Sequence, residues 1–164
     1  ATIKVKHVDL ATGCLNQDAR EVKTKFSKTF TTHFFPVGAD VVKIVADWVS
    51  HLRLNKLWGL DGPLFPKTEV GIGPSQHFEP IGMLREHWST ASPIRAIFKQ
   101  AFERAGLPYF NPHSFRSTLV QLGQRCCQNP EQLKAWSQNL GHESVLTTLY
   151  SYGTVAPARQ GRLL

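Results

Sequence analysis

The spacing of apolar residues changes once along this chain, at Ala39, and that change constrains the fold more than any other feature. Before it, "TIKVKHVDL" alternates apolar and polar residues, and "REVKTK" and "TFTTHFFPV" are rich in Thr, Val and Phe, as strands are. Between these two, "FSK" has the length of a hairpin tip. The segment 1–37 is therefore predicted to form a small antiparallel sheet of three strands.

After Ala39 the pattern is helical, with apolar residues at helical spacing from Val41 to Leu52. The next stretch, "GLDGPLFPKTEVGIGPSQHFEPIG", is dense in Gly and Pro and predicts a long irregular connection, a type that is often functional. Four more helices are predicted from "SPIRAIFKQAFERAG", "FNPHSFRSTLVQLGQRC", "QNPEQLKAWSQNLG" and "ESVLTTLYSYG". Capping and first-turn residues are expected to start these helices at Ser92, Pro93, Asn111, Pro112, Asn129 and Pro130. Glycines are expected to end them at Gly106, Gly141 and Gly153.

The predicted fold class is therefore α+β and mainly α, as one domain over 1–164. The sheet with its hairpin occupies 1–37, the helices 38–153, and a basic tail 154–164. With 19 Lys and Arg against 12 Asp and Glu, the chain has a net charge of +7. Such an excess favours a polyanionic partner such as nucleic acid. No apolar run is long enough to span a membrane.

The three cysteines, Cys14, Cys126 and Cys127, are odd in number, and two of them are adjacent. This suggests neither a disulfide framework nor a Cys-x-x-Cys zinc site, and it fits a reducing, cytosolic compartment.

Two histidines and an arginine are candidates for chemistry. His113 and Arg116 share one face at the start of a predicted helix, where backbone N–H groups and the helix dipole favour an anion. Arginine offers two parallel donors to phosphate oxygens, and histidine offers a donor or a base. Taken alone, the pair also suits a capped helix with a polar histidine at its boundary. His142 follows Gly141 in a tight connection, which favours a side chain directed at a cleft.

In order and spacing, "HSFR", "NLGH" and "TTLYSYG" resemble the catalytic domain of the tyrosine recombinases, or phage integrases. The stretch "VKTKFSKTFTTHFFPV" resembles the hairpin that carries a lysine in that family. The resemblance extends from the first strand to Gly153. It implies the catalytic-domain fold of the family, in which a bundle of helices follows the small sheet.

The resemblance also implies roles for individual residues. Arg116 would clamp the scissile phosphate, His113 would contact it and exchange a proton, and His142 would donate a further hydrogen bond. Lys25 would protonate the leaving 5′-oxygen, with Lys28 as the alternative. No metal or cofactor is implied, because arginine supplies the positive charge.

The nucleophile that the resemblance implies is a tyrosine, whose ordinary pKa near 10 would require activation by cationic neighbours. The family's usual spacing from His142 ends on Ser151, with Tyr150 and Tyr152 on either side. Tyr152 is preferred, because it abuts Gly153, where the helix is expected to stop. Tyr150, one residue further inside the helix, is the alternative nucleophile and the stronger candidate for a core aromatic.

The implied function is that of a site-specific DNA recombinase or integrase of a phage or mobile element. It would cleave and rejoin double-stranded DNA through a 3′-phosphotyrosyl intermediate and self-associate on that DNA. It would act in the cytoplasm, on the nucleoid. The family has an earlier arginine ahead of the first strand, whereas no arginine precedes Arg20 here. The chain is therefore expected to be the C-terminal part of a larger recombinase, truncated before the first catalytic arginine and weak or inactive alone.

Two other functions remain open. "EQLKAWSQNLGHESVLTTLYSY" also fits a helix-turn-helix, so the chain would then be a DNA-binding module without catalysis. A metal-dependent nuclease is less favoured, because the seven histidines form no His-x-x-x-His or His-Glu-x-x-His pattern. Only the recombinase requires His113, Arg116 and His142 to converge on one phosphate.

Overall fold

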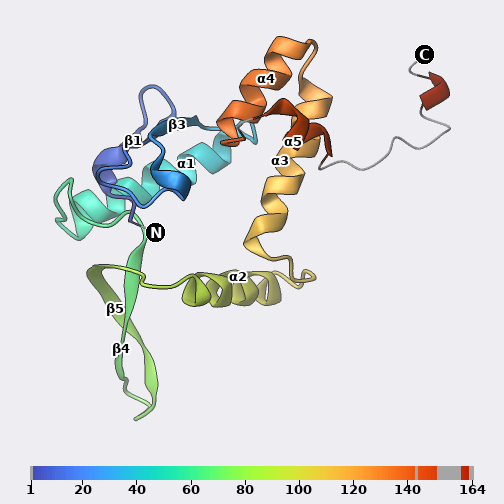
Figure 1. Cartoon of the computed structure of the whole chain (residues 1–164). Helices are drawn as coiled ribbons and strands as arrows, with labels where there is room; N and C mark the ends of the chain where they lie inside the picture. The colour runs from blue at the N-terminus through green and yellow to red at the C-terminus, as the bar shows by residue number, and fades with distance from the viewer. Residues whose placement is uncertain (1, 143, 151–159, 163–164) are drawn as a thin grey trace. The chain divides into compact units, whose positions relative to one another are not determined.

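The computed structural model describes residues 2–142, 144–150 and 160–162, and these form a mixture of helices and strands. Contacts within the chain divide it into two compact units, Ala1–Ile94 and Arg95–Leu164. Figure 1 shows the order of the elements along the chain. None of the helices described is long and apolar enough to cross a membrane.

The first unit contains the predicted three-stranded antiparallel sheet, in the order β1 (Val8–Asp9), β2 (Cys14–Gln17) and β3 (Phe30–His33). A short 3₁₀ turn, Val5–His7, precedes it. The prediction of the middle strand at 20–25 is wrong, because this strand lies at Cys14–Gln17. The Asp9 carboxylate reverses the chain early by accepting the N–H groups of Ala11 and Thr12, at 2.9 and 3.1 Å.

The first predicted helix is confirmed as α1 (Ala39–Ser50), which continues into a π-helical turn, His51–Asn55. The prediction of an irregular connection over 59–82 is wrong. The segment contributes most of an antiparallel hairpin of β4 (Pro66–Ile72) and β5 (Phe78–His87), so the stretch 38–153 is not all helical. Its glycines leave room for side chains from the opposite strand, since a Cβ on Gly71 would lie 2.5 Å from the Ile81 side chain.

The core of this unit lies around three buried residues, Val5, Leu52 and Trp58. Trp48, Val49 and Met83 pack against them. The Trp48 indole N–H donates a hydrogen bond of 2.8 Å to the carbonyl of Leu64, so its polar atom is satisfied where the ring is half-buried.

The second unit is helical, with α2 (Ser92–Arg104) crossing its boundary and α3 (Pro112–Cys126), α4 (Pro130–Asn139) and α5 (Val145–Tyr150) inside it. The two predicted Asn-Pro starts are confirmed. Asn111 accepts the N–H groups of His113 and Ser114, and Asn129 accepts that of Gln132. The left-handed backbone of Gly106 and Gly141, with φ of 65° and 71°, follows the ends of α2 and α4. Gly153, the predicted end of the last helix, lies outside the described residues.

Candidate active site

Arg116 reaches from α3 to the end of α4. Its side chain is half-buried, and its guanidinium donates a short hydrogen bond to the backbone carbonyl of Leu140, the residue that caps α4. Carbonyls at a helix C-terminus have no partner within their own helix, and the dipole there attracts a cation. The contact therefore fixes one side of the guanidinium fork on α4.

His142 is positioned by the way α4 ends. The N–H of Gly141 donates to the carbonyl of Gln138 at 2.7 Å, and the N–H of His142 donates to that of Ser137 at 3.1 Å. These two bonds, with a left-handed glycine between α4 and His142, form a Schellman motif. The "LGH" sequence thus closes the helix and sets the backbone of His142 two residues after the carbonyl that holds Arg116.

The electrostatics of the pair follow from this placement. Burial lowers the pKa of His142 below its ordinary value, and the positive charge of Arg116 lowers it further. His142 is accordingly more fully neutral at pH 7 than an exposed histidine, and it retains one ring donor and one ring acceptor.

The packing of α3 against α4 supports this arrangement. The Trp136 indole N–H donates to the carbonyl of Leu119 at 2.9 Å, which joins the two helices by a hydrogen bond. Gly123 is buried against the same ring, and a Cβ there would lie 2.6 Å from the indole nitrogen. The absence of a side chain at Gly123 is what lets the two helices approach at this point.

His113 lies one turn before Arg116 on α3, and its side chain is exposed. Asn111 already accepts the N–H groups of His113 and Ser114, so these two backbone donors are occupied in the structure. Any attraction for an anion at this end of α3 then comes from side chains and the helix dipole rather than from those two N–H groups.

The remaining predicted residues are distributed as follows. Lys25 begins a 3₁₀ turn, Lys25–Ser27, and Lys28 follows it, so both lie in the connection between β2 and β3 of the first unit. Tyr150 ends α5. Tyr152 lies outside the described residues. The structure thus places Arg116 on the Leu140 carbonyl, two residues before His142, with His113 on the same helix as Arg116.

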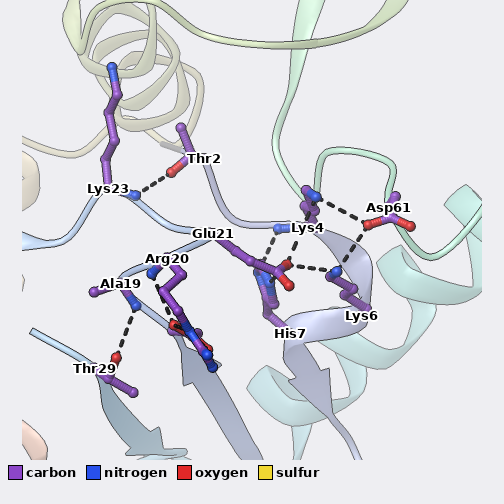
Figure 2. A network of polar contacts seen from close by, with 11 residues as sticks. Thr2, Lys4, Lys6, His7, Ala19, Arg20, Glu21, Lys23, Thr29 and Asp61 are labelled. Atoms are coloured by element: carbon purple, nitrogen blue, oxygen red, sulfur yellow. Dashed lines mark hydrogen bonds and ion pairs between the residues drawn. The ribbon is translucent and has the colours of Figure 1, made fainter. Parts of the chain in front are cut away.

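The first unit also holds an ion-pair network that the sequence did not indicate. Figure 2 shows Lys4, Lys6 and His7 gathered around the carboxylates of Glu21 and Asp61. Lys6 lies 2.6 Å from Glu21 and 3.1 Å from Asp61, and the buried His7 ring lies 3.2 Å from Glu21. Hydrogen bonds from Lys6 and then from His7 lower the pKa of Glu21, so the network favours its own charged form.

Among the described residues, no group of three or more His, Cys, Asp or Glu side chains is arranged to hold a metal ion. No known protein family model and no curated protein matches this sequence.

Proposed function

We propose that this chain is a tyrosine recombinase, or integrase, with the catalytic-domain fold of that family, and that it cleaves and rejoins strands of double-stranded DNA. The observation that carries the proposal is that Arg116 binds the Leu140 carbonyl at the end of α4, two residues before His142, whose pKa is lowered by burial and by the charge of Arg116. Arg116 and His142 are far apart in the sequence, and they belong to two of the three motifs that resemble the family.

A bound anion would account for the placement of a guanidinium near this imidazole. A guanidinium beside an imidazole disfavours a proton on the imidazole, and a phosphodiester between them would reverse that effect. Arg116 keeps donors available beyond the one held by Leu140, because a guanidinium has five N–H groups. His142 would donate a hydrogen bond to a second phosphate oxygen, and its pKa would rise as the negative charge in the transition state grows.

The reaction follows from the roles that the resemblance implies. The hydroxyl of Tyr152, or of Tyr150 as the alternative, gives its proton to His113 while its oxygen attacks the phosphorus and forms a 3′-phosphotyrosyl bond. The bond to the 5′-oxygen breaks, and Lys25, or Lys28, supplies the proton to that oxygen. The 5′-hydroxyl of another strand then attacks the phosphotyrosyl bond and passes its proton to the same lysine, and the released tyrosine recovers its proton from His113. The number of phosphodiester bonds is conserved, so no cofactor is needed.

The partners of the proposed enzyme are a DNA duplex and further copies of itself assembled on that DNA, within the bacterial cytoplasm. The net charge of +7 supports the first of these. Phosphate contacts release counterions, so duplex affinity should fall steeply as salt rises.

A covalent adduct tests the proposal. The chain is incubated with a nicked duplex that traps the phosphotyrosyl bond, and the products are separated on a denaturing gel. We expect a covalent adduct, because Arg116 and His142 would both donate to the phosphate oxygens whose charge grows in the transition state. Tyr152→Phe should abolish the adduct and Tyr150→Phe should preserve it. The reverse pattern would reassign the nucleophile, and an adduct that survives the double variant would overturn the proposal.

A non-catalytic DNA-binding module is the second candidate. The observation in its favour is that α4 and α5 are consecutive helices joined by the Gly141 turn and in contact with each other. This is the arrangement of a helix-turn-helix. Salt-dependent duplex binding without any adduct, even after prolonged incubation, would favour this module over the recombinase.

A further inference from the structure

The connection between β2 and β3 contains an exposed aromatic residue. Phe26, the central residue of the Lys25–Ser27 turn, has 75% of its surface exposed. Its backbone is left-handed, with φ of 61° and ψ of 24°, and Ser27 follows with φ of 50°. A bulky side chain rarely adopts this conformation, and such residues are concentrated where the chain has a function.

Hydrogen bonds around Phe26 hold this turn in shape. The Thr24 hydroxyl donates to the carbonyl of Lys28 at 2.8 Å, and the N–H of Ser27 donates to the carbonyl of Thr24 at 3.3 Å. At its base, the N–H of Ala19 donates to the Thr29 hydroxyl at 3.1 Å, as Figure 2 shows. The ring of Phe26 is therefore presented to solvent on a turn that is closed by its neighbours.

The chemistry around the ring is basic. The segment 22–39 contains Lys23, Lys25 and Lys28 but no Asp or Glu. The carboxylates just before it are engaged elsewhere, since Asp18 binds Arg20 and Glu21 binds Lys6 and His7. An exposed apolar ring in a segment that contains lysines and no carboxylates suits a partner with apolar faces inside an anionic shell, and that combination describes a nucleic acid duplex.

We propose that Phe26 inserts its ring against the nucleobases of a DNA duplex while the lysines around it contact the phosphates. This inference rests on the proposed function for the identity of the partner. Apolar side chains that enter between base steps unstack them and bend the duplex. Base–aromatic stacking contributes roughly fivefold to hundredfold in affinity for each base, as judged by alanine substitution.

Phe78 provides a matched control within the chain. It is 80% exposed and begins β5, so it is a second solvent-exposed phenylalanine in a hairpin of the same unit. Its neighbours are His77 and Glu79 rather than lysines. Exposure alone therefore does not distinguish the two residues, and only the basic surroundings of Phe26 predict DNA contact.

The experiment measures duplex affinity by fluorescence anisotropy at several salt concentrations for wild type, Phe26→Ala, Phe26→Gly and Phe78→Ala. The duplex carries 2-aminopurine, which brightens when it is unstacked. Both Phe26 variants should bind roughly fivefold to hundredfold more weakly with the same salt dependence, and the 2-aminopurine signal should disappear. Phe78→Ala should bind within about twofold of wild type and keep the signal, because its ring makes no stacking contact.

Phe26→Gly separates folding from binding. Glycine adopts a left-handed backbone without strain, so this variant should melt no lower than wild type although it binds DNA more weakly. Equal binding by Phe26→Gly and wild type would overturn the inference and leave the proposed function intact. Absence of duplex binding by wild type at low salt would overturn both.

Discussion

Two charged clusters in this molecule are built in opposite ways. In the first unit, Lys4, Lys6 and His7 surround the carboxylates of Glu21 and Asp61. These contacts raise the pKa of Lys6 and lower those of Glu21 and Asp61, so every shift favours the charged form. In the second unit, burial and then the charge of Arg116 lower the pKa of His142, so both oppose a positive charge on the imidazole.

The difference separates a structural cluster from a site. The network joins the N-terminal 3₁₀ turn to Glu21 and Asp61, residues that are distant from it in the sequence, and its charges complement one another. In the Arg116–His142 pair a positive charge on the imidazole is disfavoured, and an added anion would remove that penalty. We therefore expect substitutions in the network to affect stability, and substitutions in the pair to affect binding and chemistry.

The largest effect is expected from Arg116→Ala. Loss of the phosphate donor should slow adduct formation by roughly two to three orders of magnitude. Arg125→Ala is the matched control, since Arg125 is an exposed arginine in the last turn of the same helix, and it should change the rate by less than about threefold. Equal losses in the two variants would mean that general basicity, and not the pair, drives the reaction.

Gly123→Ala should disturb the packing of α3 against α4, which positions Arg116, without changing Arg116 or His142. The added Cβ would lie 2.6 Å from the Trp136 indole nitrogen, and overpacking of this kind costs about 1–3 kcal/mol. Chemical denaturation should register this loss in the second unit. Gly59→Ala, where a Cβ meets nothing within 4 Å, should be nearly neutral, and similar stability of the two variants would remove the packing argument.

The smallest effect is expected from Glu21→Gln, which keeps a hydrogen-bond acceptor but removes the charge. The folded pKa of Glu21 is lowered, so its stabilising contribution is present above the ordinary carboxyl pKa and is lost as pH falls through the lowered value. The stability difference between wild type and variant should therefore be modest near neutral pH and should vanish in acid. A difference that grows with falling pH would contradict the assignment of the network as charge-stabilised.

Local chemistry explains what could be predicted from the sequence. Asn111 and Asn129 cap their helices as expected, and Gly141 follows the end of α4 as expected. These sequence signals act over only a few residues. The misplaced middle strand has an equally local cause, because the Asp9 turn reverses the chain early and brings Cys14–Gln17 into the sheet. The hairpin at 66–87 was missed because its glycines, which make room for Ile81 and Glu79, resemble loop residues in the sequence.

Tertiary contacts account for the rest. The sequence suggested that His113, Arg116 and His142 belong together, but the bond from Arg116 to the Leu140 carbonyl depends on how α3 and α4 pack. The ion-pair network depends likewise on contacts between Lys4, Glu21 and Asp61, which no short motif records. Phe26 lies in the predicted hairpin tip, yet its left-handed backbone had no signal in the sequence.

Titration of His142 by NMR tests the central claim most directly. In the free chain its pKa should lie below the ordinary histidine value, and Arg116→Gln should raise it while Arg125→Gln leaves it unchanged. Addition of a short duplex to wild type should raise the pKa of His142, because a phosphate placed beside Arg116 favours the protonated ring. A His142 pKa that does not respond to the duplex under conditions where the duplex is bound would contradict the account.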